Sequence, residues 1–274
     1  MPSKPIDVSV IIAAYQATDF IATAVKSALV QQGGSLEVIV APDDSNDYRF
    51  LQDLDSRVVV LDPLGVDRKP AGPAATRNRA LEKARGAFVA LLDADDYWSP
   101  NYLQLLLPLA AAHGLAYGRT AIADWGGAER RAIPRRPAGA RIGYAHFADA
   151  FGSLHGVVRR DPRRRWQDIL AEDVLFDVES LALAGGTAPH VADAVYWLRI
   201  RPQSASHSDD FISGIDAGYS AIIARIAAGE TLIPAAERDA AIAVFRAWQA
   251  MNLRFSKDYA ADPSLEFHAY IAGL

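Results

Sequence analysis

An uncharged apolar run that ends in three carboxylates is the feature that most constrains how this chain folds. The run covers Phe88–Leu92, and Asp93, Asp95 and Asp96 follow it. A short run of this kind is typical of a strand that is buried on both faces of a mostly parallel sheet. Open α/β sheets bind their ligands outside the carboxyl ends of the strands, which is where these acids would lie. The stretch therefore predicts an α/β sheet with carboxylates at its ligand-binding edge.

The carboxylates themselves admit two interpretations. Asp93 and Asp95 leave the same face if the strand continues that far, because side chains alternate along a strand. Acids this close repel each other, and a divalent cation shared with a diphosphate would relieve the repulsion through oxygen ligands alone. Alternatively, the acids belong to a solvated turn and cap the helix that follows. The stretch by itself leaves both interpretations open.

The rest of the N-terminal half alternates between strand and helix patterns. The predicted strands cover residues 8–13, 36–40, 58–61 and 88–92, and the predicted helices cover residues 20–30, 48–54, 73–84 and 101–113. Three strand–helix units within about 100 residues, with no hairpin signal between them, favour a parallel, doubly wound sheet.

The chain beyond Tyr117 is less regular. We expect a strand near 118–124, a loop rich in Gly, Pro and Arg over 126–144, a helix over 171–183 and a late strand over 194–200. From Phe211 onward the pattern is almost all helical, with breaks at Gly229 and Pro234. We therefore expect a main α/β domain over residues 1–210 and a C-terminal helical extension over residues 211–274.

Positive charge is concentrated in the middle of a chain whose net charge is only −5. Between Arg130 and Arg165 there are ten arginines and only two acids, Asp149 and Asp161. Such a stretch can face phosphates or an anionic membrane surface. It can equally be a set of solvated loops, and both interpretations stay open.

The composition of the chain bears on its cellular location and excludes cysteine chemistry. The chain has no cysteine, which excludes disulfides and thiolate metal sites. No run approaches the roughly 18 apolar residues of a membrane span, and the N-terminal Met1–Pro5 segment lacks an apolar signal region. We expect a cytoplasmic protein, with a peripheral position at the inner membrane if the arginines contact lipid.

Four separated motifs, taken in order, resemble the inverting glycosyltransferase family numbered two, whose members adopt the GT-A fold. The motifs are Val8–Tyr15, Asp43–Ser45, Gly72–Asn78 and Leu92–Asp96. The resemblance covers residues 6–120 well and residues 121–208 more loosely. It implies a Rossmann-like, mostly parallel sheet flanked by helices, to which the C-terminal helical extension is appended.

The resemblance places the D-x-D motif of the family on Asp93 and Asp95, with Ala94 between them. In the family these acids hold a divalent metal, Mn²⁺ or Mg²⁺, and the diphosphate of the donor. The neighbouring acid approaches the donor sugar, and here that acid is Asp96. His207 lies in a segment that resembles the one closing over the diphosphate, so it is either a metal ligand, a phosphate donor or a surface residue.

The resemblance also implies a nucleoside pocket. The residues implied in it are Ala14, Tyr15, Asp43, Asp44, Arg77 and Asn78. The usual pair of acids reads Pro42–Asp43 here and Asp44 follows, which leaves open which acid accepts from the base or ribose. Arg77 can contact the nucleotide or its phosphates with its planar fork.

A catalytic base is the next requirement of the implied reaction. An inverting transfer needs one carboxylate to deprotonate the acceptor hydroxyl as it attacks the anomeric carbon. In the family an acid pair that opens a helix does this, and Glu172–Asp173 resembles that pair. We choose Asp173 as the base. Alternatively, both acids only stabilise the N-terminus of the helix through its dipole.

The implied function is a metal-dependent, non-processive transfer in polysaccharide biosynthesis. A hexosyl group would move from a UDP-linked sugar to a hydroxyl of a glycan or lipid-linked acceptor, and no nucleic-acid partner is expected. Processive members carry a Q-x-x-R-W motif and membrane spans, whereas the nearest match here, Pro162–Trp166, lacks the Gln.

Two other functions compete with this one. The first is a non-catalytic relative that binds sugar nucleotides or glycans and assembles partner enzymes. Its support is that Gln16 and Pro42 stand where relatives usually have Asn and Asp. The second is a nucleotidyltransferase, which would carry a basic Gly-rich loop after the first strand, but residues 13–18 contain neither Gly nor Lys or Arg.

Overall fold

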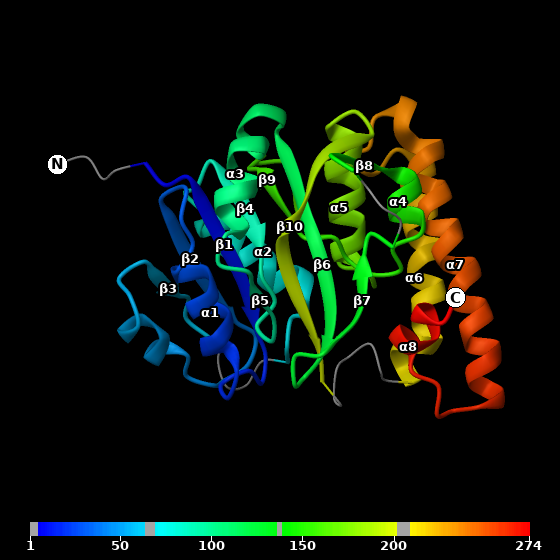
Figure 1. Ribbon diagram of the computed structural model, residues 1–274, viewed down its shortest axis with the longest axis horizontal. Coiled ribbons are helices and arrows are strands. Elements are labelled where there is room, and N and C mark those ends of the chain that lie inside the picture. Colours follow the sequence, from blue (N-terminus) through cyan, green and yellow to red (C-terminus); the bar gives the residue numbers. More distant parts are fainter. Residues whose placement is uncertain (1–4, 64–68, 136–138, 202–208) are drawn as a thin grey trace. The chain divides into compact units, whose positions relative to one another are not determined.

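The computed structural model describes residues 5–63, 69–135, 139–201 and 209–274, and Figure 1 shows the helices and strands along the chain. The chain divides into two compact units, and each is described by itself. Unit 1 comprises Met1–Gly118, His155–Asp168 and Val191–Trp197. Unit 2 comprises Arg119–Leu154, Ile169–His190 and Leu198–Leu274.

The centre of unit 1 is a set of parallel strands. They are β1 (Val8–Ala14), β2 (Leu36–Pro42), β3 (Val58–Val60) and β4 (Phe88–Leu91), in the order β3-β2-β1-β4. Both faces of β1, β2 and β4 are buried, which is why these strands read as continuous apolar runs. The parallel α/β sheet predicted from the sequence is confirmed.

Helices cover this sheet. They are α1 (Ile21–Leu29), the 3-10 helix η1 (Arg49–Asp53), α2 (Pro73–Lys83) and α3 (Tyr102–His113). Helix α2 packs on β1 and β2, and α1 packs on β2. The buried residues of α1 recur every three or four positions, as expected for a helix with one apolar face. Helix α3 ends at Gly114, whose φ of +82° suits the left-handed C-terminal cap.

Unit 1 also contains antiparallel strands. They are β5 (Tyr97–Trp98), the start of β6 (Leu115–Asp124), β9 (Gly156–Arg159) and the middle of β10 (Thr187–Ile200). The strand order in this unit is β3-β2-β1-β4-β9-β6-β10-β5. A Cβ atom on Gly118 would lie 2.3 Å from the carbonyl oxygen of Ala194, so glycine permits a close approach of β6 and β10. The sequence pattern missed β5 and β9.

Unit 2 contains two short strands where the sequence predicted a loop. Strand β7 (Glu129–Ile133) pairs with the end of β6, and β8 (Arg141–Gly143) pairs with the start of β10. The prediction of a loop over 126–144 is therefore wrong for these segments. The prediction failed at β7 because a charged residue, Arg131, occupies a buried position there. The strand therefore lacks the alternation of apolar and polar residues that identifies a strand in a sequence.

Helices make up the remainder of unit 2. They are α4 (Tyr144–Ala148), α5 (Glu172–Leu183), α6 (Asp209–Ala228), the 3-10 helix η3 (Ala235–Glu237), α7 (Arg238–Ala261) and α8 (Phe267–Ala272). Helix α6 packs on α7, α7 on α4, and α8 on β7. The helical C-terminal region is confirmed, while a domain boundary at residue 210 stays a prediction. Within the described ranges, no helix is both long and apolar enough to cross a membrane.

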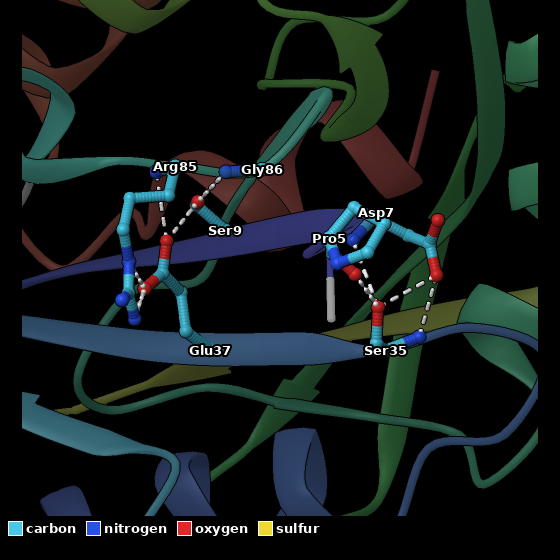
Figure 2. A network of polar contacts seen from close by, with 7 residues as sticks. All are labelled: Pro5, Asp7, Ser9, Ser35, Glu37, Arg85 and Gly86. Carbon is cyan, nitrogen blue, oxygen red and sulfur yellow. Dashed lines mark hydrogen bonds and ion pairs between the residues drawn. The ribbon is translucent and has the colours of Figure 1, made fainter. Parts of the chain in front are cut away.

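A polar network joins the amino ends of the parallel strands. The carboxylate of Glu37 on β2 is 2% exposed and accepts hydrogen bonds from Ser9 Oγ at 2.7 Å and from Arg85 Nη2 at 2.6 Å (Figure 2). Ser9 Oγ in turn accepts from the backbone N–H of Gly86 at 2.8 Å. The network thus ties β1 and β2 to the segment that leads into β4.

Candidate functional site

The carboxyl ends of three neighbouring strands in unit 1 bring most of the predicted donor residues together. Strand β1 lies between β2 and β4, with Ala14 opposite Pro42 and Ile11 opposite Leu91. The residues that follow these strands therefore share one edge of the sheet. Tyr15 is 49% exposed there.

The two acids after β2 hold different parts of this edge. The buried carboxylate of Asp43 accepts hydrogen bonds from the backbone N–H groups of Ala71 at 2.8 Å and Gly72 at 2.9 Å. It thereby fixes the segment that opens α2. Gly72 has a φ of +87°, a conformation that glycine adopts without strain.

Asp44 is partly exposed and holds the turn after β1. Its carboxylate accepts from the backbone N–H of Gln16 at 2.5 Å and from the hydroxyl of Tyr48 at 3.1 Å. Burial, to which the negative charge of Asp44 adds, raises the pKa of Tyr48 to about 12. The Tyr48 hydroxyl is therefore a neutral donor at physiological pH.

Asp93 lies between two nitrogen-bearing side chains. Nη2 of Arg77, from α2, is 2.8 Å from Asp93 Oδ1, and the side chains of Arg77 and Asp93 are 8% and 28% exposed. Nε2 of His155 lies 3.8 Å from Asp93 Oδ2. Burial tends to raise the pKa of the Asp93 carboxyl, but the charges of Arg77 and His155 outweigh it and hold that pKa below its ordinary value. Asp93 is thus a carboxylate.

Tyr196 of β10 holds the turn formed by residues 93–96, which we call the acidic turn. Its ring is fully buried and stacks on the imidazole of His155, with centroids 3.9 Å apart. Its hydroxyl accepts from the backbone N–H of Asp93 and donates to the buried carboxylate of Asp96. Burial, together with the charges of Asp96 and Asp93, raises the pKa of Tyr196 well above its ordinary value.

The other predicted donor residues differ in their surroundings. Ala94 is buried and Asp95 is partly exposed, within the turn that follows β4. Asn78 engages the backbone of Trp166 through both of its amide atoms, at 2.7 and 2.9 Å. Asn78 therefore holds the chain at Trp166. His207 lies outside the described residues.

No ready-made metal cage exists in the part of the chain that the structure describes. There, no three His, Asp or Glu side chains lie close enough together to hold an ion by themselves.

The candidate base lies in unit 2, at the start of α5. Glu172 is 8% exposed and Asp173 is partly exposed, and both lie in the first turn of the helix, as predicted. The hydroxyl of Ser153 donates a hydrogen bond to Oδ2 of Asp173. Burial, together with the charge of Asp173, raises the pKa of Tyr219 in α6 above its ordinary value.

The arginine-rich stretch is divided between the two units. Arg163 pairs with Asp161 at 2.6 Å in unit 1, and Arg130 lies 3.7 Å from Asp124 in unit 2. Arg131 is buried, and Arg136 lies outside the described residues. The membrane contact of this stretch stays a prediction.

Sequence reasoning missed His155, Tyr196, Ser153 and Tyr219. The one signal for Tyr196 was its place in the predicted strand over 194–200. His155 and Ser153 lie in a segment for which no element was predicted, so no pattern pointed to them.

Comparisons with known proteins identify the family and the fold of this chain. Residues 9–162 match the family model described as glycosyl transferase family 2. The UDP-Glc:alpha-D-GlcNAc-diphosphoundecaprenol beta-1,3-glucosyltransferase WfgD of Escherichia coli is 33% identical over 113 residues, which are 40% of this chain and 43% of the relative. The succinoglycan biosynthesis protein ExoO of Rhizobium meliloti is 35% identical over 113 residues, which are 39% of this chain and 31% of the relative. The chain thus spans less than half of the length of these relatives.

Solved structures show the same fold at low sequence identity. TarS 1-349 of S. aureus in complex with UDP-GlcNAc has a TM-score of 0.67 and 20% identity, over 97% of this chain and 79% of that one. Mannosyltransferase PcManGT from Pyrobaculum calidifontis, in complex with GDP-Man and Mn2+, has a TM-score of 0.61 and 18% identity, over 99% and 80%. The expected GT-A fold is confirmed. Because the family match covers more than half of its residues, this chain belongs to glycosyl transferase family 2.

Proposed function

We propose that this chain is an inverting, metal-dependent, non-processive glycosyltransferase. It moves one sugar from a UDP-linked donor to a hydroxyl of a glycan or lipid-linked acceptor. The observation that carries the proposal is the shared edge at which Tyr15, Asp44 and the Asp93–Asp96 turn follow β1, β2 and β4. Ligands of α/β sheets bind at such an edge. A protein that binds a sugar nucleotide needs a pocket for the nucleoside and a group, such as a metal ion, that neutralises the negative charge of the diphosphate.

Within this site we assign the nucleoside to the turn formed by Tyr15 and Asp44. Both acids accept hydrogen bonds, Asp43 from two backbone N–H groups and Asp44 from Gln16, Asn46 and Tyr48. Asp43 is buried, whereas Asp44 is the more exposed acid. We therefore assign contact with the base or ribose to Asp44 and the support of α2 to Asp43. Arg77 keeps Asp93 ionised and in place beside the diphosphate.

The carboxylates at this edge fit a divalent ion such as Mn²⁺ or Mg²⁺. Asp93 and Asp95 offer hard oxygen ligands, and small divalent ions are usually held by one or two carboxylates together with substrate phosphates. When bound, the ion supplies positive charge that stabilises the leaving diphosphate. His207 as a further ligand stays a prediction.

The transfer is a single displacement at the anomeric carbon. The acceptor oxygen forms a bond to this carbon while the bond from the carbon to the diphosphate oxygen breaks, so the configuration inverts. Asp173 takes the proton of the acceptor hydroxyl, and the nucleoside diphosphate leaves with the electron pair. Glu172, which is more deeply buried, is the alternative base.

The names of similar proteins support the substrate classes. WfgD is named for UDP-Glc and for an acceptor linked to diphosphoundecaprenol, and the TarS structure contains UDP-GlcNAc. We therefore propose a UDP-linked donor, a lipid-linked or glycan acceptor, and a cytoplasmic protein that works peripherally at the inner membrane.

A thermal-shift screen of sugar nucleotides, with and without manganese, tests the proposal. A donor at a hundredfold excess over its dissociation constant stabilises the folded state by about 2.7 kcal/mol. We expect a UDP-sugar to do so only with manganese, and the Asp95→Asn variant to lose this effect. Asp53→Asn, which changes an exposed acid of η1, is the matched control and should respond like the parent chain. If no sugar nucleotide stabilises the protein, the proposal is wrong.

A further inference from the structure

The C-terminal helices of unit 2 converge on residues 147–153, which we call the base-support segment. Trp248 of α7 is buried, and its Nε1–H donates to the carbonyl oxygen of Phe147 at 2.8 Å. The Trp248 ring also lies 6.1 Å from that of Phe151. Tyr219 of α6 meets the same indole edge to face, at 6.1 Å and 90°. Helix α7 therefore contacts this segment directly through Trp248, and helix α6 contacts it indirectly, because Tyr219 packs on Trp248.

The last helix, α8, reaches the base-support segment through a buried arginine. Arg131 of β7 donates from Nη1 to the carbonyl oxygen of Ala150 at 2.9 Å and from Nη2 to that of Phe151 at 2.5 Å. Its Nε donates to Nδ1 of His268 in α8 at 3.3 Å. Burial, with repulsion from Arg135, lowers the pKa of Arg131 to about 10, so the guanidinium stays charged at neutral pH. One side chain thus links α8 to two consecutive carbonyl groups.

These contacts restrain a backbone that is unusual in itself. Phe151 has a φ of +47°, which is uncommon for a residue with a side chain. A Cβ atom on Gly152 would lie 2.6 Å from Cδ1 of Ile133, so the chain passes close to β7 at this point. The next residue is Ser153, whose hydroxyl donates to Asp173. The direction of the Ser153 hydroxyl therefore depends on how residues 150–152 are held.

We propose that the C-terminal helices position the general base: through Arg131 and Trp248 they hold the base-support segment, and Ser153 at its end orients the Asp173 carboxylate. The inference rests on the proposed role of Asp173. The Ser153 hydroxyl occupies Oδ2 and fixes the plane of the carboxylate, and Oδ1 is the oxygen that receives the acceptor proton. Ser153, Arg131, Trp248 and His268 are positioning residues, since they act through Asp173.

A double-mutant cycle on the full chain tests the link between Ser153 and Asp173. Turnover is measured as release of UDP from the donor that binds, with water or α-D-GlcNAc-diphosphoundecaprenol as the acceptor. We expect Ser153→Ala to lower kcat about tenfold or more with an unchanged donor KM, because a misplaced catalytic group costs rate rather than donor binding. In an Asp173→Asn background the same change should cost nothing further, since its effect passes through that carboxylate. An equal loss in both backgrounds would overturn the proposal.

A matched pair at His268 tests the contribution of α8. His268→Ala removes the acceptor for Arg131, whereas His268→Asn keeps an acceptor atom near the position of Nδ1. We expect His268→Ala to lower kcat and to speed amide hydrogen exchange in residues 147–153, and His268→Asn to restore both. If exchange of this segment is the same in the parent chain and in His268→Ala, α8 does not hold it.

The two proposals fail in different ways. If Asp173→Asn turns over like the parent chain, the assignment of the base is wrong. If Asp173→Asn is inactive while Ser153→Ala and His268→Ala are normal, the base stands and the positioning role is wrong.

Discussion

The hydroxyl of Tyr196 accepts a hydrogen bond from the backbone N–H of Asp93 at 3.0 Å. The same hydroxyl donates to Oδ2 of Asp96 at 2.8 Å, so one side chain of β10 holds both ends of the acidic turn after β4. Fixing both ends restricts the directions in which the side chains of Asp93 and Asp95 leave the turn. The geometry of the proposed diphosphate site therefore depends on a residue that we expect to make no contact with the donor.

Tyr196→Phe isolates the contribution of this hydroxyl. The ring should keep its stack on His155, while the N–H of Asp93 and the carboxylate of Asp96 lose the hydroxyl. We expect the free energy of unfolding to fall by about 1–3 kcal/mol, the usual cost of removing a partner from a buried polar group. Donor affinity with manganese should also fall. Urea denaturation and titration calorimetry measure the two effects.

Tyr102→Phe is the matched control for this prediction. It also removes a buried tyrosine hydroxyl, one that donates to the carbonyl oxygen of His155 at 2.7 Å rather than to the acidic turn. It should cost comparable stability and leave donor affinity unchanged. Equal losses of donor affinity in the two variants would mean that the hydrogen bonds of Tyr196 to the acidic turn are not needed for donor binding.

The ion pair between Arg77 and Asp93 predicts a pH-dependent stability. Because the folded-state pKa of Asp93 is lowered, the pair contributes fully above the unfolded pKa of about 3.9 and loses its contribution as pH falls through the lower folded value. Arg77→Met keeps an apolar stem without the charge, and we expect it to lower the free energy of unfolding by about 3 kcal/mol at neutral pH. The loss should shrink in acid, because Asp93 of the variant then becomes neutral.

Denaturation of the metal-free protein at neutral and acidic pH checks this prediction. Arg49→Met is the control, because Arg49 lies 3.4 Å from Asp62 on the surface, where the two side chains are 63% and 93% exposed. It should change stability little at either pH. A loss in Arg77→Met that is equal at both pH values would assign it to packing rather than to the charge of Asp93.

Much of the fold could be predicted because its parallel part is locally encoded. Each central strand is buried on both faces and therefore stands out as a short apolar run, and the acids after β2 and β4 mark where these strands end. The antiparallel strands carry weaker signals. Strand β7 includes a buried arginine, whose carbonyl and histidine partners come from distant segments. A charged residue in such a short segment favours the prediction of a loop.

The same reasoning explains which site residues could be predicted. Asp93 follows directly from the end of its strand. Tyr196 and His155 reach Asp93 from segments that lie far away in the sequence, and no local pattern encodes such pairings. Sequence order also could not separate Asp43 from Asp44. The difference between them is the position of the Ala71–Gly72 backbone, which only the folded chain fixes.

Glu37 should be a stabilising residue without a role in donor binding. Its buried carboxylate accepts hydrogen bonds from Ser9 and Arg85 at the amino ends of the strands (Figure 2). The acids of the proposed site follow the carboxyl ends of these strands. Glu37→Gln turns an N–H toward these donors, and we expect a loss of about 3 kcal/mol in the free energy of unfolding. Ser35→Ala, in the neighbouring contact with Asp7, should cost about 1 kcal/mol. Weaker donor binding by Glu37→Gln at a temperature where it is folded would contradict this separation.

Asp173→Asn should separate chemistry from donor binding. The change keeps the shape of the side chain and an oxygen that can accept from Ser153, but it removes the base. We expect turnover to fall by a factor of roughly a hundred to ten thousand, the usual contribution of a positioned general base. Donor affinity should hardly change, because we place the diphosphate beside Asp93 and Asp95. Steady-state rates and calorimetry with manganese measure the two quantities.

Glu172→Gln is the natural comparison, since both acids lie in the first turn of α5 and both favour its N-terminus through the helix dipole. A helix-stabilising role alone predicts small and similar losses of stability for the two variants and no selective loss of turnover. A general base predicts one inactive variant that folds normally. If Glu172→Gln is inactive while Asp173→Asn turns over normally, the base is Glu172. If both variants turn over normally, the base lies elsewhere and the acids of α5 serve the helix alone.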